Sequence, residues 1–276
     1  MTDIQPDATP EEFSLKEVAP TLKFNKEISI IIPAKNEESL IGQTIEAALK
    51  SVGIFCGVTE SLPSLKSTSA EIIVVDNLST DRTCEIVRNY TDKYQVHLEI
   101  CERLKAPCAR NHGVKVSSGQ VLIFIDADTV IPPESVTRIM HLCEDKKYRA
   151  GITRLVSLEP GLRAWLWWTF WDYVRCLPLP RAKAMPAFMF CTRDVFDQFG
   201  PFDEEVQIGE EWPILASIYR QQPHHFIYDR KLAVQTSSRR MDLQRFGYLR
   251  LFSKYLWAIL HRSGRIDYPS HLRHTT

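Results

Sequence analysis

The sequence contains no CxxC pair of cysteines, no glycine-rich phosphate loop and no long apolar run. Its seven cysteines are scattered and odd in number. This argues against a zinc site or a disulfide framework and favours reduced thiols in a cytosolic protein. The sequence has no GxGxxG motif after the first predicted strand, and it has no GxxxxGK(S/T) motif anywhere. If a nucleotide binds, a cation or Arg and Lys side chains must therefore neutralise its phosphates.

A net charge is also lacking, because 34 Lys and Arg balance 34 Asp and Glu. No global field therefore draws the chain to nucleic acid, and we expect no nucleic-acid partner. The acidic amino end has no apolar core, so we expect no signal peptide. No stretch reaches about 18 uninterrupted apolar residues, so we expect no membrane span. The charge is nevertheless unevenly distributed, since the sequence from Asp229 onwards contains ten Lys and Arg but only three Asp.

What is present is an alternation of apolar strands and amphipathic helices. Apolar runs predict strands at 28–32, 71–75, 96–101 and 121–125, and helical spacing predicts helices at 38–51, 80–90, 109–117 and 132–143. Polar residues 57–70 are typical of a surface loop. This rhythm predicts an α/β fold with a predominantly parallel central sheet flanked by helices.

The pattern loosens after residue 131. We expect strands at 188–191 and 232–234, helices at 213–220 and 241–261, and an aromatic cluster at 165–173. The predicted organisation is a mobile N-terminal arm (1–26), an α/β domain (27–235, with a first half at 27–130 and a second half at 131–235) and a basic amphipathic helical extension (236–276).

The most informative motif is Asp126-Ala127-Asp128, which ends the apolar run 121–125. One intervening residue puts the two carboxylates on one side of an extended chain, roughly 6–7 Å apart. This spacing lets one carboxylate hold a hard divalent cation while the other accepts from a water or ligand hydroxyl. Polar residues also follow the strands at 28–32 and 71–75, and the carboxyl ends of parallel strands share one edge. The three segments are therefore expected to line one crevice.

Five segments in order resemble the motifs of family 2 glycosyltransferases, over about residues 28–221. They are IIPAKNEE, VVDNLSTDRT, ARNHGV, IFIDADT and FGPFDEEVQIGEEWPI. The resemblance implies a GT-A-type nucleotide-sugar-binding fold and inverting transfer of a sugar from a nucleotide-sugar donor, UDP-sugar favoured, to an acceptor hydroxyl. It also implies Mn²⁺ or Mg²⁺ as the cofactor. By this resemblance, residues 27–235 are the catalytic domain, with 27–130 as its donor half and 131–235 as its acceptor half.

By the same resemblance, Pro33, Asn36 and Glu37 form the first donor loop. Asp76 accepts a hydrogen bond from the uracil imide N–H, because a carboxylate is an acceptor that suits this donor. Guanine and thymine present similar imide N–H groups, so these bases stay open as alternatives. Arg110 shapes the nucleotide pocket. Asp126 lies near the ribose, and Asp128 holds the metal on the diphosphate.

Glu210-Glu211 stands where the family has Glu-Asp, so the resemblance makes Glu211 the catalytic base, with Glu210 left as an alternative. Glutamate is one methylene longer than aspartate, which changes the reach of the base. The plainer interpretation is two acids favouring a helix N-terminus. A second departure is Leu78, where the family more often has glycine. Because leucine disfavours positive φ, we expect this turn to differ.

Arg239 and Arg240 follow the strand at 232–234, and two interpretations stay open: a bidentate clamp on the diphosphate, or a solvated basic loop. Two other functions also stay open. IFIDADTV matches the nucleophile motif of haloacid-dehalogenase-like phosphatases, with Asp126 as nucleophile, and a non-catalytic nucleotide-sugar-binding protein would carry the same donor loops.

The basic carboxyl end and the Trp and Tyr residues permit peripheral attachment to an anionic membrane. We therefore hypothesise that the unknown acceptor is lipid-linked or membrane-presented, and that the protein is cytoplasmic, with peripheral contact at the cytoplasmic face of a membrane.

Overall fold

A computed structural model describes residues 26–57, 69–183, 187–206, 208–243 and 246–261. The predicted N-terminal arm, apart from Lys26, lies outside the described residues, as do most of the expected loop at 57–70 and the end of the C-terminal extension. No described helix has both the length and the apolar character needed to cross a membrane.

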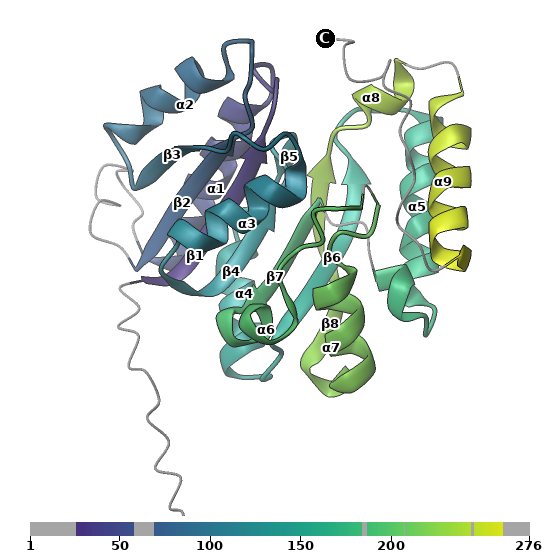
Figure 1. Ribbon diagram of the computed structural model, residues 1–276. Coiled ribbons are helices and arrows are strands. Elements are labelled where there is room, and N and C mark those ends of the chain that lie inside the picture. Colours follow the sequence, from purple (N-terminus) through teal and green to yellow (C-terminus); the bar gives the residue numbers. More distant parts are fainter. Residues whose placement is uncertain (1–25, 58–68, 184–186, 207, 244–245, 262–276) are drawn as a thin grey trace, which may run out of the picture.

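The first half alternates strands and helices, as the sequence predicts (Figure 1). Its elements are β1 (Lys26–Ala34), α1 (Ile41–Phe55), β2 (Ala70–Asp76), α2 (Thr83–Thr91), β3 (Val96–Ile100), α3 (Ala106–Val116), β4 (Gly119–Ile125), β5 (Thr129–Val130) and α4 (Ser135–Glu144). The four predicted helices exist, and the start of each differs by three residues from its prediction. The residues before α1 and α2 are instead held in a loop-to-loop hydrogen-bond network that is part of the site.

The second half is less regular. Its elements are β6 (Ala150–Ser157), α5 (Leu162–Cys176), η2 (Pro180–Lys183), β7 (Phe188–Thr192), α6 (Arg193–Phe199), α7 (Trp212–Gln221), η3 (Pro223–His225), β8 (Phe226–Thr236), α8 (Arg239–Asp242) and α9 (Gly247–His261). The predicted strand at 232–234 is the end of the longer β8. The single helix predicted at 241–261 is wrong, because Phe246 has φ 65° and α9 starts only after it.

All described strands join one eight-stranded sheet in the order β3-β2-β1-β4-β7-β6-β8-β5. β3, β2, β1 and β4 run parallel, and β6 and β8 are parallel to each other, whereas β7 is antiparallel to both of its neighbours. The expected α/β fold with a helix-flanked central sheet is therefore confirmed, and the sheet, expected to be predominantly parallel, contains both parallel and antiparallel pairs. The ends of β1, β2 and β4 lie next to one another at one edge.

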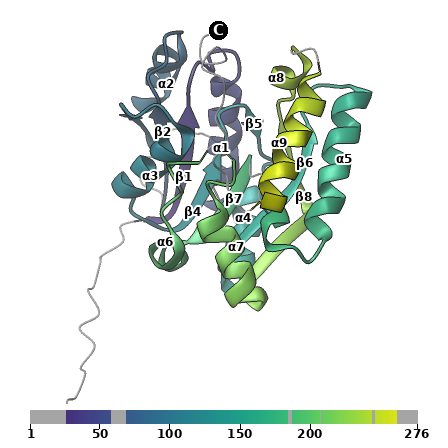
Figure 2. The same ribbon diagram turned by 45° about the vertical axis from the view of Figure 1, so that its right-hand side comes forward.

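Helices cover both faces of this sheet, and alternate residues of β1 show why. Ile28, Ile30 and Ile32 face a core shared with α1, α4 and α5, whereas Ile31 faces a second core with α3, α6 and α7. Strands buried on both faces become continuous apolar runs, which is the pattern the sequence displays. Figures 1 and 2 place α5 and α9 side by side at the β6–β8 end of the sheet.

Candidate active site

The loops after β1 and β2 are joined by hydrogen bonds on both sides. The Asn36 backbone N–H donates to Ser79 Oγ (2.9 Å), and the Thr80 N–H donates to Asn36 Oδ1 (2.8 Å). Asn36 adopts φ 53°, a left-handed conformation that asparagine tolerates better than most residues. The pairing fixes Asn36 at the edge of the crevice.

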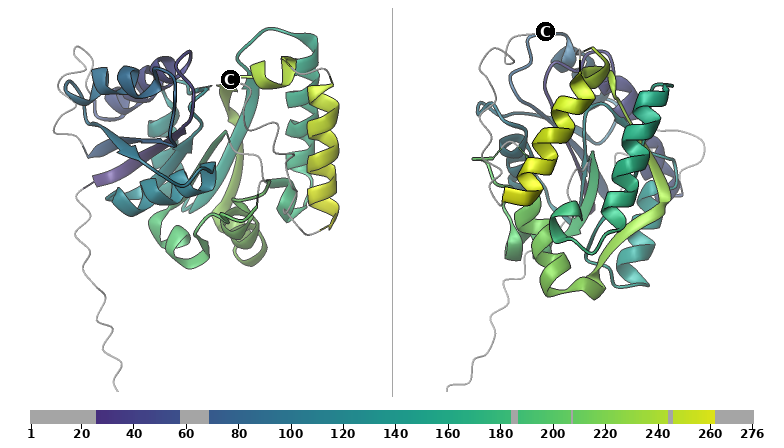
Figure 3. Two further views of the ribbon diagram at one scale, coloured as in Figure 1. Left: turned by 45° about the horizontal axis from the view of Figure 1, so that its top comes forward. Right: turned by 90° about the vertical axis from the view of Figure 1, so that its right-hand side faces the viewer.

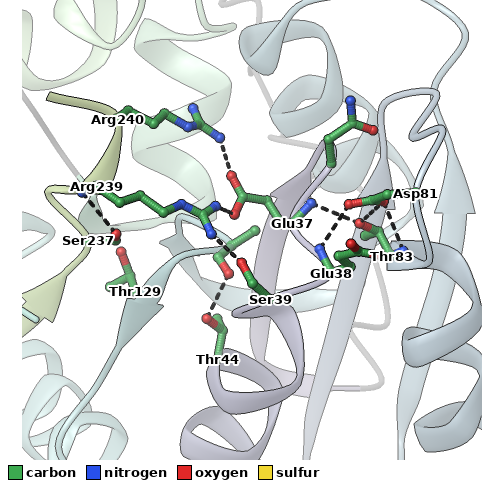
Figure 4. Close-up of polar contacts among 12 residues, drawn as sticks. Glu37, Glu38, Ser39, Thr44, Asp81, Thr83, Thr129, Ser237, Arg239 and Arg240 are labelled. Carbon is green, nitrogen blue, oxygen red and sulfur yellow. Dashed lines mark hydrogen bonds and ion pairs between the residues drawn. The ribbon is translucent and has the colours of Figure 1, made fainter. Parts of the chain in front are cut away.

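The next two residues of the first loop continue this pairing. The Glu37 N–H donates to Thr83 Oγ1 (2.8 Å), and the Glu38 N–H donates to Asp81 Oδ2 (3.1 Å) (Figure 4). Burial opposes the charge of Asp81, but hydrogen bonds from Thr83 and Glu38 outweigh it and lower the pKa of Asp81. Asp81 therefore joins the two loops, a role that the sequence pattern alone does not indicate.

Asp76 ends β2 and is only 2% exposed. Its Oδ2 accepts from the Ser79 N–H (3.0 Å), whereas its buried Oδ1 accepts no hydrogen bond from a nitrogen or oxygen of the described residues. Burial and Asp76 together raise the pKa of the nearby Cys84 thiol to about 11, so that thiol stays protonated and is at most a weak donor. Asp76 thus has a buried carboxylate oxygen for which the described residues offer no nitrogen or oxygen donor, only the weak thiol of Cys84.

The turn after Asp76 corrects one sequence prediction. Leu78 has φ 59°, so the chain keeps the left-handed conformation that glycine would favour instead of forming a different turn. Asn77 holds the turn in place, because its Nδ2 donates to the carbonyls of Cys101 (3.0 Å) and Arg103 (2.6 Å). Leu78 itself is 41% exposed. Anchoring by Asn77 offsets the conformational cost at Leu78.

Arg110 connects the two acidic motifs. Its guanidinium is buried in α3 and donates to Asp126 Oδ1 (2.7 Å) and Glu210 Oε1 (2.9 Å). Burial opposes its charge, but Asp126, Glu210 and Glu211 outweigh it and raise the pKa of Arg110 further. Asp126 and Glu210, which are 84 positions apart in the sequence, therefore both accept hydrogen bonds from one guanidinium. The sequence pattern does not predict this bridge.

Asp128 lies beyond the end of β4, and its carbonyl accepts from the Ser237 N–H (3.1 Å). Burial and the Asp126 carboxylate raise the pKa of Asp128 to about 7, although Arg240 and Arg239 act in the opposite direction. A partly buried carboxylate among other acids is stabilised by a cation. The structure brings Asp128 and the two arginines into one electrostatic environment.

Arg239 and Arg240 reach from α8 across to the first loop (Figure 4). Each donates to one oxygen of Glu37, whose side chain is 3% exposed, and Arg239 also donates to Ser39 Oγ. Burial lowers the pKa of Arg240, but Glu37, Asp128 and Asp126 outweigh it and raise that pKa. Both arginines therefore contact the first loop, although the Arg240 side chain is 67% exposed to solvent.

The α8 arginines are positioned by a second network that the sequence analysis missed. Ser238, just before α8, accepts from Trp168 Nε1 of α5 (3.0 Å), and its own N–H donates to Glu159 (2.7 Å). Thr129 of β5 donates to Thr236 of β8 (3.0 Å), which joins the end of β8 to the Asp128 segment. Only the side-by-side placement of distant strands reveals these contacts.

Glu211 precedes α7 and is 3% exposed, and its carbonyl accepts from the Ile214 and Leu215 N–H groups. The turn before it requires Gly209, which has φ +83° and against which Trp212 packs; a Cβ there would lie 2.3 Å from the indole. Pro33, the remaining predicted residue, lies in β1 opposite Val75. The described strand ends thus bring Pro33, Asn36, Glu37, Asp76, Asp126 and Asp128 to one edge.

No group of three or more His, Cys, Asp or Glu side chains within the described ranges forms a ready-made metal cage. Asp126 already accepts from Arg110, which leaves Asp128 as the carboxylate suited to a cation. Mg²⁺ and Mn²⁺ are commonly held by one or two carboxylates together with substrate phosphates and water. The residues therefore fit a metal that arrives with a diphosphate.

A helix-flanked sheet with acidic residues at its carboxyl edge is the arrangement that the resemblance to GT-A-type glycosyltransferases implies. The family model described as glycosyl transferase family 2 matches residues 29–195, more than half of the chain. The chain therefore belongs to glycosyl transferase family 2.

Several curated proteins are similar in sequence over part of the chain. A poly(ribitol-phosphate) beta-glucosyltransferase of Bacillus spizizenii is 32% identical over 135 residues, which are 48% of this chain and 19% of that protein. Glycosyltransferase AglE of Haloferax volcanii is 37% identical over 111 residues, 39% of this chain and 31% of that protein. The chain thus spans a third or less of the length of these relatives.

Solved structures share the fold at low identity. The mannosyltransferase PcManGT from Pyrobaculum calidifontis, in complex with GDP-Man and Mn²⁺, aligns with a TM-score of 0.60 and 17% identity over 92% of this chain and 69% of that one. TarS of S. aureus in complex with UDP-GlcNAc aligns with a TM-score of 0.55 and 16% identity over 90% and 69% of the two chains. These likenesses support the fold assignment.

Proposed function

We propose that this glycosyltransferase moves a sugar from a UDP-sugar to an acceptor hydroxyl with inversion at the anomeric carbon, assisted by a divalent cation. The observation that carries the proposal is the Arg110 guanidinium, which joins Asp126 of the predicted donor site to Glu210 beside the predicted base. In this proposal, the bridge through Arg110 would hold the donor and acceptor chemistry at one position. Inversion follows from a single displacement with a single base.

The preference for uracil rests on Asp76. Its buried Oδ1 lacks a nitrogen or oxygen donor among the described residues, and the imide N–H of uracil supplies one. An unsatisfied buried acceptor costs about 1–3 kcal/mol, so pairing it on binding favours such a base. Solved relatives carry UDP-GlcNAc and GDP-Man, so guanine is the competing base that the test must include.

Asp128 would hold Mn²⁺ or Mg²⁺ together with the donor diphosphate, and the metal would neutralise charge on the leaving diphosphate. Arg239 and Arg240 lie close enough to Asp128 to influence its charge and are suited to the same phosphates. On donor binding they would exchange Glu37 for phosphate oxygens. Asn36 and Pro33 shape the loop against which the nucleoside rests.

Glu211 acts as the base in this proposal. It takes the proton from the acceptor hydroxyl, whose oxygen forms the new bond to the anomeric carbon while the bond to the diphosphate breaks. Glu210 is committed to Arg110, so its role is to position that guanidinium. General-base catalysis of this kind contributes typically 10²–10⁴-fold to the rate.

We propose further that the acceptor is lipid-linked or presented at a membrane, with the enzyme in the cytoplasm and in peripheral contact with that membrane. Relatives named for poly(ribitol-phosphate) and undecaprenyl-phosphate support an anionic acceptor of this class. The phosphatase alternative loses its support, because the chain belongs to family 2 and Asp126 is engaged by Arg110.

A two-step experiment tests the proposed function. A thermal-shift screen of UDP-, GDP- and dTDP-sugars with Mn²⁺ identifies the donor, and release of nucleoside diphosphate then measures turnover. Glu211→Gln is expected to bind the donor as the wild type does and to lose at least about 10²-fold in turnover. Full turnover by Glu211→Gln, with loss in Glu210→Gln, would transfer the base role to Glu210.

A further inference from the structure

The outer face of the α5–α9 helix pair exposes a large apolar surface. Figure 3 shows the two helices side by side as the outermost layer of the β6–β8 end. We define the α5–α9 face as the exposed large side chains of these helices. They are Leu162, Trp165, Leu166, Phe170 and Tyr173 of α5, and Leu249, Leu256 and Trp257 of α9.

Sequence spacing explains why this face exists. The exposed apolar residues of α5 recur three or four positions apart, whereas Trp167, Trp168 and Trp171 form a second stripe buried against the core. α5 is therefore apolar on two sides. Phe170 contacts Phe252 of α9 with ring centroids 5.4 Å apart, so the exposed stripes of the two helices form one surface. Contiguous exposed apolar patches of this kind mark interaction sites.

The described residues of α5 and α9 expose basic side chains and no acidic side chain. Asp172 is the only acid in either helix, and it is buried beneath the face, where it accepts from Arg230 (2.6 Å). Arg163 and Arg250 are exposed on the two helices, and the Arg230 guanidinium lies 6.0 Å from the Tyr173 ring centre. Apolar and aromatic side chains flanked by arginines are complementary to an anionic lipid surface.

A second copy of the chain fits this face less well. Symmetric pairing through one patch would bring Arg163 and Arg250 near the same residues of the other copy, with no exposed acid of either helix to pair with them. A bilayer instead accepts Trp and Tyr at its headgroup level while phosphates pair with the arginines.

We propose that the α5–α9 face docks peripherally on a membrane rich in anionic phospholipid. It is linked directly to the candidate site, because Trp168 of α5 donates to Ser238 and the chain continues through Arg239 and Arg240 into α9. Docking would orient the site toward an acceptor at the bilayer surface. This surface assignment deepens the proposed function but rests on its own contacts.

Vesicle co-sedimentation of the full chain tests the face. We expect binding to phosphatidylcholine–phosphatidylglycerol vesicles that exceeds binding to phosphatidylcholine alone and weakens with salt. The variant Leu162→Ser/Trp165→Ser/Leu249→Ser should lower the partition coefficient at least roughly tenfold. The variant Arg163→Gln/Arg250→Gln should lower the partition coefficient roughly fivefold for each arginine removed. This loss should occur with the anionic vesicles only.

The matched control is Ile54→Ser/Leu104→Ser, which removes two exposed apolar side chains from elsewhere on the surface and should leave partitioning unchanged. Equal partitioning of the wild type and the triple variant would overturn the inference. So would a dimer in solution that the triple variant abolishes, with no vesicle binding by the wild type. Donor-induced thermal shifts on the same preparations test the proposed function separately, because they require no membrane.

Discussion

Removal of the Arg110 guanidinium should destabilise the protein substantially, and Arg110→Met is the variant that tests this. The side chain is 7% exposed and forms two charge-assisted hydrogen bonds, to Asp126 and Glu210. Methionine retains apolar packing near the Phe202 ring, 5.7 Å from the guanidinium, but leaves both carboxylates without this partner. The change therefore isolates the charge bridge.

The expected cost follows from burial. Breaking a buried ion pair by removing one partner costs about 3–5 kcal/mol. The Asp126 side chain is 35% exposed and that of Glu210 is 18% exposed, so water screens part of the lost interaction. We therefore expect the lower end, about 3 kcal/mol. For a chain of this size, that corresponds to a fall in melting temperature of roughly 6–12 °C.

Thermal unfolding followed by circular dichroism, without ligand or metal, measures this effect. The double variant Arg110→Met/Glu210→Gln should lose less stability than the two single variants lose in sum. The difference, which is the coupling energy, should be about 1 kcal/mol or more. Arg110→Lys should recover only part of the stability, because an ammonium lacks the planar fork that reaches both carboxylates. A shift below about 2 °C for Arg110→Met would refute the bridge.

Three further outcomes are expected. Leu78→Val should lower stability by about 1–2 kcal/mol relative to Leu78→Gly in urea unfolding, because the position has positive φ; equal stabilities would refute the strained turn. Burial opposes the charge of Asp172, but hydrogen bonds from Arg230 and Tyr228 outweigh burial and lower the pKa of Asp172. The ionised carboxylate therefore contributes to folding stability at neutral pH, and this contribution is lost as pH falls below about 4. Asp172→Asn should therefore flatten the acid side of the stability curve without changing donor binding, and an unchanged curve would contradict this. Gly209→Ala should lower both turnover, by at least about tenfold, and the melting temperature, since a Cβ there collides with the Trp212 indole beside Glu211; wild-type turnover and melting temperature would exclude that strain.

The donor half could be predicted from the sequence because both local pattern and topology favour one solution. Runs such as 71–75 are buried on both faces, so their composition identifies parallel strands, and parallel strands place their carboxyl ends at one edge. The order of the strands along the chain is therefore enough to predict that the acidic residues at their ends lie at one edge. The residues that join the loops, such as Ser79 and Thr83, carry no comparable signal, because their role depends on the pairing of two distant turns.

The acceptor half was harder to predict for physical reasons. α5 is apolar on a buried side and an exposed side, which removes the contrast on which helical periodicity depends. The break between α8 and α9 coincides with Gly247, where a Cβ would lie 2.3 Å from the Met241 carbonyl oxygen, a close approach that only the structure reveals. At Leu78 the sequence favoured a different turn, whereas the contacts of Asn77 hold the left-handed conformation.

The central claim is that Asp128 and a divalent cation bind the diphosphate of a UDP-sugar at the carboxyl edge of the sheet. Calorimetric titration of UDP in the presence of Mn²⁺ tests it most directly, with Asp128→Asn compared with the wild type and with Asp92→Asn, an exposed acid elsewhere, as the control. The account predicts Mn²⁺-dependent UDP binding that is at least roughly tenfold weaker in Asp128→Asn and unchanged in the control. Wild-type affinity and the same Mn²⁺ dependence in Asp128→Asn would contradict it.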